Sequence, residues 1–595
     1  MTDLPLADNF PAADRKAWLD LVEKTLKGAD FDKRLVTTTY DGLKLQPIYG
    51  QSQDAALPTK DGGGWAILQR ADMPSIEEAN TQALRDLEAG ASGLTLMIAG
   101  HGGPSGFGVE ASTVADFDRL LDGVYLEMIP LRLDAGPKTA EAAAALLGLY
   151  EKRGLDAAKA DISLGHDPVG ELALHGTEVD ESPLNGVPAG GAITSFQADG
   201  RTFHNAGASE AQELSCALAS AVTYLRWLEV SGSTLEDAVR QVSMVLSVDA
   251  DMFLSAAKLR AARRLWARVQ EAMALDPQPL KLHAEASWRM MSKRDPHVNL
   301  LRATAATFAA ATAGADSLTM LPFTSAIGLP DRFARRMARN VQLVLGEESR
   351  LGHVSDPAAG SGYMDTMAHE LAAEAWRRFQ QIEAGGGIVA ALQNGELQSQ
   401  IAETRQARAK NIAKRKDALT GVSEFPHLAE TPAEVLAPLD AQAAGPQNTL
   451  AAYRTAEPFE ALRDAADGAG TRPKVFLANL GPVAAFTGRA TWAANVFEAG
   501  GIEAVQNDGF ESAEAAAAAF SESGASIAIL CSSDEVYETL GPDVAQALSA
   551  AGAKHVYLAG RPSDALTAAG VGTFVYAGCD ILDVLNGAHE LLGVA

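Results

Sequence analysis

The chain has 595 residues, of which 47% are hydrophobic and 21% charged, so several domains with ordinary globular composition are expected. Its net charge of −27 argues against nucleic acid and anionic membrane surfaces as partners, because both repel an acidic protein. Three unclustered cysteines, no secretion signal and no apolar run of about 18 residues predict a soluble, cytoplasmic protein without disulfides, structural zinc or membrane spans.

The first predicted element is an N-terminal arm over residues 1–46. Within it, AADRKAWLDLVEKTLKG places Trp18, Leu19, Val22 and Leu26 at helical spacing, between Pro-containing flanks that predict extended chain. The arm has no core of its own. We therefore expect it to lie on another domain or on another chain.

Residues 47–400 alternate short apolar runs with longer helical segments such as TAEAAAALLGLYEKRG and LSCALASAVTYLRWLEV. The runs that predict buried strands are GLTLMIA (93–99), VYLEMIPLRL (124–133), KADISL (159–164) and SLTMLPF (317–323). Repeated strand–helix alternation predicts a closed (β/α)₈ barrel with insertions. An open sheet is the alternative, and the length of the region favours closure.

Residues 401–473 differ in composition from the region before them. A basic helical run, ETRQARAKNIAKRKDA, precedes the sequence GVSEFP and a Pro/Ala-rich segment, LAETPAEVLAPLDAQAAGPQ. This pattern predicts a solvated helix face followed by a linker that wraps the barrel.

Residues 474–595 contain five strand-like runs, KVFLAN, IEAVQ, SIAILC, HVYLAG and TFVYAG, each followed by a helical segment. Five such units predict a doubly wound, flavodoxin-like domain. Ligands of that fold bind beyond the carboxyl ends of the strands. The first of these loops, within residues 478–497, is apolar; we expect it to be packed, while the amides of a helix starting near Gly488 could hold an anion.

Common catalytic motifs give weak signals. The sequence HELAA at His369 lacks the second histidine of a zinc-protease helix, and it is interpreted as an ordinary surface helix. The loop GHGGPSGFG (100–108) is either an ordinary barrel loop or a phosphate site, and the first interpretation is favoured because no Gly-Lys-Ser/Thr ending follows. No Gly-x-Ser-x-Gly motif supports a serine hydrolase.

Residues 294–363 closely resemble the barrel of the acyl-CoA mutases, specifically methylmalonyl-CoA mutase and its relatives. Their sequence begins RDPHVNLLRATAATF and ends RLGHVSDPAAGSGY, and residues 203–214 and 253–269 resemble the same family. The resemblance covers nearly the whole chain, including the order of barrel and flavodoxin-like domain. It implies isomerisation of (R)-methylmalonyl-CoA and succinyl-CoA by radical chemistry on adenosylcobalamin bound to the C-terminal domain.

The matching residues depart from the family at the cobalamin loop. The family has a Lys followed by Asp-x-His-x-x-Gly; here Asn479 stands for the Lys, Val483 for the Asp, Ala485 for the His, and Gly488 is retained. Alanine cannot ligate cobalt, and valine cannot orient an imidazole. The resemblance therefore implies that this chain binds no cobalamin and no metal.

The barrel departs from the family as well. Arg70 stands where the family has a Tyr, and a Gln-Thr-Ser-Gly segment that lines the acyl-CoA channel matches residues 285–288, with Glu285 for Gln and Trp288 for Gly. An acid and an indole are expected to disfavour and obstruct an anionic thioester. His204 matches the family's substrate His, and we interpret it as a retained packing or hydrogen-bonding group rather than a catalytic one.

These departures resemble those of the small (beta) subunit of heterodimeric bacterial methylmalonyl-CoA mutase, of which GVSEFP and RTAEPFEALRDAAD also look typical. The resemblance implies a non-catalytic chain that stabilises a large (alpha) subunit, the partner in which adenosylcobalamin is bound. One alternative is a self-sufficient acyl-CoA isomerase or acyl-CoA-binding protein that uses His204 and His283. Another is an assembly scaffold with partners outside this family.

Overall fold

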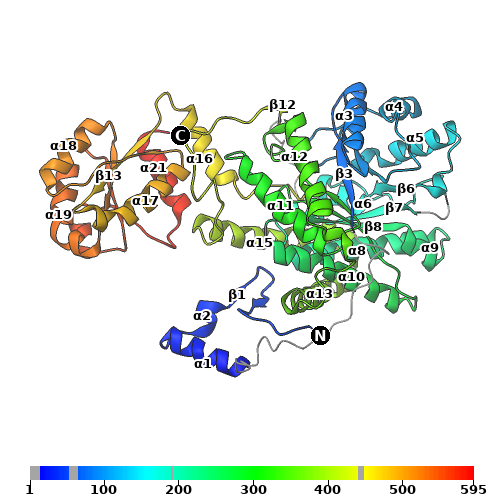
Figure 1. Ribbon diagram of the computed structural model, residues 1–595, viewed down its shortest axis with the longest axis horizontal. Helices are drawn as coiled ribbons and strands as arrows, with labels where there is room; N and C mark the ends of the chain where they lie inside the picture. Colours follow the sequence, from blue (N-terminus) through cyan, green and yellow to red (C-terminus); the bar gives the residue numbers. More distant parts are fainter. Residues whose placement is uncertain (1–13, 53–63, 189–191, 440–445, 447, 595) are drawn as a thin grey trace, which may run out of the picture.

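The computed structural model describes residues 14–52, 64–188, 192–439, 446 and 448–594. Two α/β domains lie side by side, and an N-terminal arm lies below the segment that joins them (Figure 1). The predicted fold class is confirmed, since an eight-stranded parallel barrel is followed by a five-stranded parallel sheet. No helix in the described ranges is long and apolar enough to cross a membrane.

The barrel closes in the order β10-β3-β4-β5-β6-β7-β8-β9, so every strand pairs with its neighbours in sequence and β10 returns to β3. Its strands are β3 (Ala66–Ala71), β4 (Gly93–Met97), β5 (Leu131–Asp134), β6 (Asp161–His166), β7 (Ala192–Asp199), β8 (Val242–Val248), β9 (Lys281–Ala286) and β10 (Ser317–Thr319). The strand β4 is buried throughout, because helices cover its outer face and neighbouring strands fill the interior.

Helices surround this barrel. They are α3 (Ile76–Glu88), α4 (Val114–Leu120), α5 (Thr139–Lys152), α6 (Pro168–His175), α7 (Arg201–Ala206), α8 (Glu210–Val230), α9 (Leu235–Arg240), α10 (Met252–Ala272), α11 (His297–Thr312), α12 (Arg332–Leu343), α13 (Gly362–Ala384) and α14 (Gly387–Gln393). The longest of them fit the predicted periodicity. His369 lies exposed on α13, as expected of a surface helix residue.

Two strand predictions were too long. Of residues 317–323, only Ser317–Thr319 form β10. Of residues 124–133, only Leu131 to Leu133 join β5, and the preceding residues form turns in which Tyr125 and Met128 are each 80% exposed. The physical reason is that two residues interrupt the strand: Gly123 adopts a turn conformation with φ +74°, and Pro130 lacks the amide hydrogen that a central strand needs.

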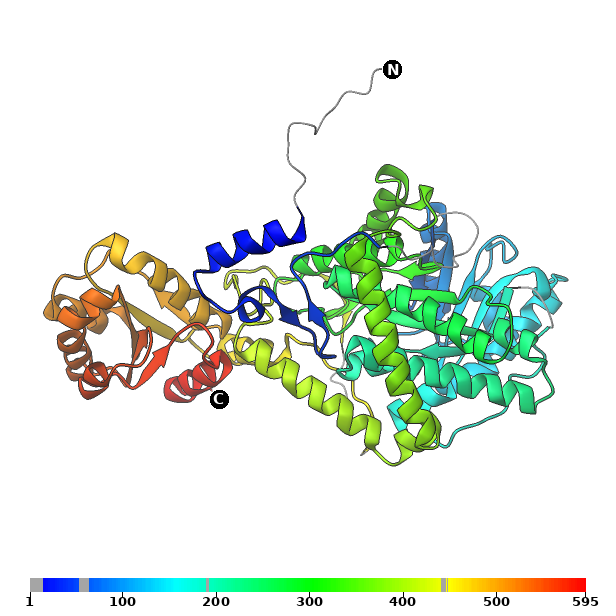
Figure 2. The ribbon, with the colours of Figure 1, turned by 90° about the horizontal axis from the view of Figure 1, so that it is seen from below.

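The helix α15 (Glu396–Ala413) begins before residue 401 and bridges the barrel and the second domain (Figure 2). The following chain returns to the barrel as β12 (Val435–Pro438), which pairs antiparallel with β11 (Gly328–Pro330). It then forms α16 (Glu457–Gly468). Arg454, just before this helix, makes a buried ion pair of 2.7 Å with Glu460 in its first turns. Arg294 reaches Asp464 of α16 at 2.5 Å, so this helix is attached firmly to the barrel.

The C-terminal sheet has the order β14-β13-β15-β16-β17. Its strands are β13 (Lys474–Asn479), β14 (Glu503–Val505), β15 (Ile527–Cys531), β16 (His555–Ala559) and β17 (Thr573–Val575). One apolar core lies under α17 (Val483–Ala499) and α21 (Ile581–Leu592), and another lies under α18 (Ala513–Ser523), α19 (Asp534–Ala550) and α20 (Asp564–Ala568). This is the doubly wound arrangement that the sequence predicted.

The arm consists of α1 (Arg15–Leu26), α2 (Phe31–Leu35) and the hairpin of β1 (Thr37–Thr38) and β2 (Lys44–Leu45). No residue of α1 or α2 is fully buried. The hairpin anchors the arm, because Asp41 accepts hydrogen bonds from the hydroxyl of Ser209 at 2.5 Å and the amide of Ala211 at 3.0 Å. The arm therefore leans on α8 while its helices stand apart from the barrel.

Candidate functional site

Charged side chains converge at the carboxyl ends of the barrel strands, where barrels carry their functional groups. Arg70 comes from β3, Asp134 from the end of β5, Asp199 from the end of β7 and Glu285 from β9, while Arg201 begins α7. These residues reach one cavity because alternate residues of each strand point into the barrel.

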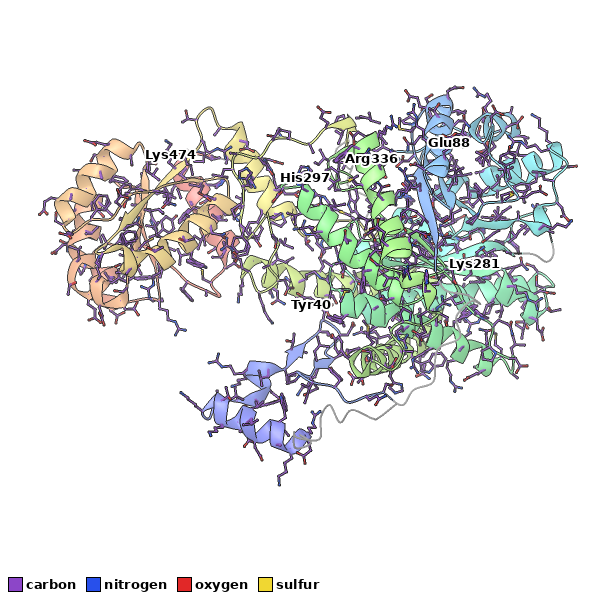
Figure 3. All side chains as sticks on the ribbon, viewed as in Figure 1. Tyr40, Glu88, Lys281, His297, Arg336 and Lys474 are labelled. Carbon is purple, nitrogen blue, oxygen red and sulfur yellow. The ribbon has the colours of Figure 1, made fainter. Side chains whose placement is uncertain are left out.

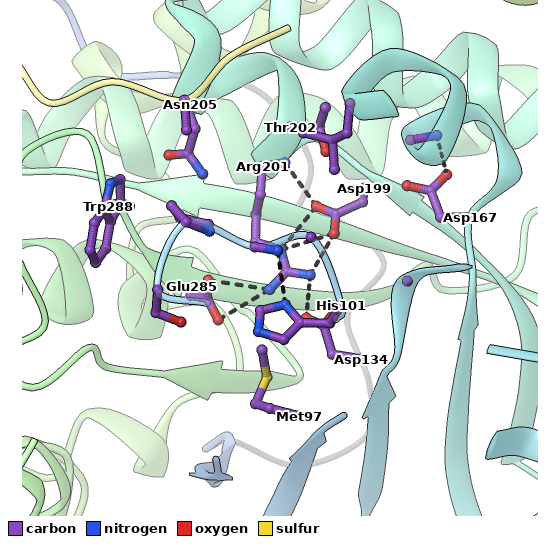
Figure 4. A pocket seen from close by; sticks show the side chains of 18 of the residues that line it. Met97, His101, Asp134, Asp167, Asp199, Arg201, Thr202, Asn205, Glu285 and Trp288 are labelled. Carbon is purple, nitrogen blue, oxygen red and sulfur yellow. Dashed lines mark hydrogen bonds and ion pairs between the residues drawn. The ribbon is translucent and has the colours of Figure 1, made fainter. Parts of the chain in front are cut away.

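Arg201 lies at the centre of this network (Figure 4). Its guanidinium pairs with Asp134 at 2.8 Å, with Asp199 at 2.5 Å and with Glu285 at 3.2 Å. Arg70 pairs with Glu285 at 2.7 Å. All five side chains are largely buried, so each charge depends on its partners rather than on water for compensation.

The network holds its members in their charged forms. Burial opposes ionisation of Asp134 and Glu285, but the adjacent guanidinium groups, Arg201 for Asp134 and Arg70 with Arg201 for Glu285, hold both pKa values below their ordinary range. Burial also opposes the charge on Arg201, yet the surrounding carboxylates raise its pKa well above the usual value. Asp134, Glu285 and Arg201 are consequently held in their charged forms at neutral pH and are not free to exchange a proton.

Two carboxyl groups at the rim behave differently. Burial raises the pKa of Asp167, and the negative charge of Asp199 raises it further. Burial, followed by Asp134, raises the pKa of Glu171 to about 8. Glu171 is therefore largely protonated at neutral pH, which keeps its negative charge out of the cavity.

The space that remains between these groups is small. The cavity measures about 80 Å³, against the roughly 300–1,000 Å³ of typical ligand pockets. Trp288 and Leu321 close one side of it. A cavity of this size holds a few waters and is too small for an acyl-CoA thioester.

The Gly-rich loop over residues 100–108 folds across the cavity and is held by its own histidine. The amide of Gly103 donates to Nδ1 of His101 at 2.9 Å, and Nε2 lies 3.0 Å from the carbonyl oxygen of Phe107. Burial lowers the pKa of His101, so the ring is neutral and uses both nitrogens within the loop. The imidazole therefore fixes the loop conformation.

Neither His204 nor His283 lines the cavity. His204 is fully buried, with Nδ1 3.0 Å from Glu213 and Nε2 2.7 Å from the hydroxyl of Ser287. Burial and the cations of Arg289 and Lys258 hold its pKa well below the ordinary value. His283 is buried and bonds to Ser317 through Nδ1 at 2.8 Å. Both rings hold the wall together, and their placement gives no support to a site built on them.

In the C-terminal domain, the first loop differs from expectation in where its helix begins and in how much of it is packed. The helix α17 begins at Val483, so Gly488 lies in its second turn rather than at a helix start that could hold an anion. The expected packing holds for Phe486, which is buried in the core of the domain, whereas Val483 is 60% exposed. Asn479 is buried at the end of β13 and donates to the carbonyl oxygen of Asn507 at 3.2 Å.

The crevice between β13 and β15, where the strand order reverses, is bridged by side chains. The guanidinium of Arg489 donates to the carbonyl oxygen of Ser532 at 2.7 Å and to Asp534 at 2.6 Å, and it lies 5.0 Å from the ring centre of Tyr537. The hydroxyl of Ser532 donates to the carbonyl oxygen of Leu480 at 2.7 Å. Doubly wound domains bind ligands at this crevice, and here it is occupied by the protein itself.

A wider groove of about 800 Å³ lies over the ends of β15, β16 and β17, between Trp492, Arg561 and Tyr576. None of the described residues that line it is His, Cys or Met. Neither this groove nor the side chains of Val483 and Ala485 offers the imidazole or sulfur ligand that would coordinate a cobalt ion from this domain. The residues present therefore do not fit a corrinoid bound through a protein ligand.

Comparison with known proteins identifies the family. Residues 59–471 match the family model described as methylmalonyl-CoA mutase. The methylmalonyl-CoA mutase small subunit of Streptomyces virginiae is 42% identical over 626 aligned residues, which cover 100% of this chain and 99% of that protein. The chain belongs to the methylmalonyl-CoA mutase family. The small subunit of Propionibacterium freudenreichii subsp. shermanii is 35% identical, again over 100% of this chain and 97% of its own length.

Within the family, the chain groups with the small subunits. The methylmalonyl-CoA mutase of Cereibacter sphaeroides is 28% identical over 71% of this chain and 66% of its own length, whereas the small subunits above match from end to end. The resemblance to the small-subunit branch is confirmed.

The structure brings together some of the residues that mutase resemblance singled out and separates others. Arg70, Glu285 and Trp288 meet at the cavity, but His204 lies behind the wall. The sequence led us to expect that Glu285 would repel an anionic thioester. In the structure its charge is compensated, because the guanidinium groups of Arg70 and Arg201 pair with it.

Sequence reasoning missed Arg201, which organises the whole network. A signal was available in the order of residues: Asp199 ends a strand and Arg201 follows it two positions later, directly before the Phe203–Leu214 mutase motif. Its other two partners, Asp134 and Glu285, lie on strands far away in sequence, and their meeting with Arg201 is a property of barrel closure.

Proposed function

We propose that this chain is the non-catalytic small subunit of a cytoplasmic, heterodimeric, adenosylcobalamin-dependent methylmalonyl-CoA mutase. Its large subunit would bind the cobalamin and isomerise (R)-methylmalonyl-CoA and succinyl-CoA. This chain would stabilise that subunit. The observation that carries the proposal is the neutralised charge network around Arg201, which fills the barrel mouth of an otherwise complete mutase scaffold.

Two further observations support the proposal. Val483 and Ala485 have no side-chain group that could ligate cobalt, and Arg489 bridges the crevice beside them. The helix α1 leaves its apolar face, with Trp18 and Val22, only half buried, which suits a helix completed by another chain. An intact mutase scaffold whose barrel cavity and cobalamin loop both lack the family's functional side chains supports a non-catalytic role.

Gel filtration with adenosylcobalamin tests the proposal. The chain alone is expected to elute without corrinoid absorbance, whereas its mixture with a mutase large subunit from the same organism should elute as a 1:1 complex with one cobalamin. Stoichiometric corrinoid on the isolated chain, or failure to form the complex, would contradict the proposal.

Turnover of the complex gives a second test. Glu285→Gln in this chain alters the network without emptying the cavity, so mutase turnover per heterodimer should stay at the wild-type level. The control is the chain alone titrated with an acyl-CoA, for which no binding is expected. Measurable acyl-CoA binding without the large subunit would favour the self-sufficient alternative instead.

A further inference from the structure

The segment that follows α15 carries unusual backbone strain. Of the seven non-glycine residues with positive φ in the described chain, three meet here: Asp295 (φ 44°), Arg415 (φ 54°) and Phe425 (φ 54°). The left-handed region is unfavourable for residues with a Cβ atom, and it persists where surrounding structure enforces it. Clustered strain of this kind is typical of functional positions.

The turn over residues 419–425 is built to keep this conformation. The carbonyl oxygen of Leu419 accepts from the amides of Val422 and Ser423, and the amide of Gly421 donates to the carbonyl oxygen of Glu424 at 2.7 Å. Val422 and Ser423 are completely buried. The turn is therefore fixed from below and has little freedom to relax its outer residues.

The residue that this turn displays is Phe425. Its side chain is 74% exposed although the backbone is left-handed and a proline follows, two features that disfavour an aromatic residue here. The ring contributes little to the core of this chain. A large apolar group held outward on a strained backbone is better explained by a contact outside the chain.

Three lysines precede the turn in sequence, in a chain whose net charge is −27, while Glu424 of the turn itself pairs with Arg415 at 3.5 Å. Lys410, Lys414 and Lys416 are exposed at the carboxyl end of α15, and none of them makes an ion pair with a residue that the structure describes. The neighbouring Arg415 is occupied, since it donates to the carbonyl oxygen of Asn495 at 2.9 Å. We call Phe425 and these three lysines the junction patch.

The junction patch continues the surface of the arm. Tyr40, in the hairpin of the arm, donates its hydroxyl hydrogen to Asp417 and accepts from the side chain of Asn411 at 2.9 Å. The guanidinium of Arg408 lies 4.6 Å from the centre of the Tyr40 ring. Figure 3 shows Tyr40 where the arm approaches α15. The hairpin of the arm is thus attached to the stretch 408–417, which also carries the three lysines of the junction patch.

We propose that the junction patch is a docking surface for the mutase large subunit, which would present an apolar socket for the Phe425 ring within an acidic surface. The inference rests on the proposed function and adds the contact through which the partner is held. A buried aromatic ring is a typical binding hot spot, and lysines at the rim of an interface steer an acidic partner and speed association. Continuity with the arm favours a protein partner of the same heterodimer.

The experiment measures binding of the full chain to the large subunit by surface plasmon resonance. Phe425→Ala should weaken the Kd at least about tenfold, the range of interface hot spots. Reversal of the three lysines to Glu should lower the association rate about tenfold at low salt and reduce its salt dependence. The matched control is Tyr125→Ala, which removes another exposed aromatic residue at the opposite, amino-terminal end of the barrel strands and should leave the Kd unchanged.

A glycine variant separates binding from folding. Glycine adopts a positive φ without strain, so Phe425→Gly should raise the melting temperature of the isolated chain while weakening its Kd for the large subunit. Wild-type affinity in Phe425→Ala and in the lysine variant would overturn the inference. Lysine-dependent binding to phosphatidylserine vesicles, with an unchanged Kd for the large subunit, would also overturn it. If the unmodified chain does not bind the large subunit at all, the proposed function fails instead.

Discussion

Replacement of Arg201 by Leu removes the one cation that touches Asp134, Asp199 and Glu285 together. Breaking a buried ion pair from one side costs about 3–5 kcal/mol, because the charge left behind is neither hydrated nor paired. Arg201 is 12% exposed and Asp134 is 13% exposed, so water offers little relief. We expect the free energy of unfolding of Arg201→Leu to fall by about 3–5 kcal/mol at pH 7.5.

The loss should depend on pH in a defined direction. In the wild type, the depressed pKa of Asp134 keeps its contribution present above the unfolded pKa of 3.8, so little changes between pH 7.5 and 5. Without the guanidinium, burial is less compensated, and the pKa values of Asp134 and Glu285 rise. Protonation then relieves their repulsion as the pH falls, and the deficit of the variant should shrink toward pH 5.

Urea unfolding followed by tryptophan fluorescence is the assay, since Trp288 lines the same cavity. Arg119→Leu is the control: Arg119 is 56% exposed in its ion pair with Glu77, and its loss should change little. A stable Arg201→Leu variant, or a deficit that stays constant between pH 7.5 and 5, would refute the view that this network is held by charge compensation.

Three other outcomes are expected. Burial and the nearby Glu210 raise the pKa of Asp41 to about 6, above its unfolded value of 3.8. The stabilisation from protonated Asp41 is therefore complete below pH 4 and is lost as the pH rises through 6. In melting curves, Asp41→Asn should abolish this pH dependence. Trp288→Gly should lower the free energy of unfolding by about 3–5 kcal/mol. The variant should still not bind acyl-CoA, because the charge network remains. Binding measured by calorimetry would show instead that the Trp288 indole is what blocks acyl-CoA. Gly421→Ala places a Cβ atom 2.8 Å from that of Asp295 at φ +78° and should destabilise the chain by about 1–3 kcal/mol in urea unfolding, whereas Gly468→Ala, which meets open space, should not.

The local pattern of residues determined most of the fold. Apolar runs such as Gly93–Met97, and five strand–helix units after Lys474, specify buried parallel strands regardless of the rest of the chain, because period and turn chemistry are local properties. The motifs around His204 and in residues 294–363 were enough to place the chain in its family. Residues 124–130 were wrongly predicted as strand, because Gly123 and Pro130 interrupt the apolar run there.

The sequence by itself thus determined the two domains, the mutase family and the missing cobalt ligand at Ala485. Only the tertiary structure decided that Arg201 meets Asp134 and Glu285, that Arg489 bridges the crevice of the second domain, and that Val483 and Phe425 face outward. The physical reason is that charge compensation and exposure depend on which elements meet when the barrel closes and the linker returns. Spacing along the chain does not fix those meetings.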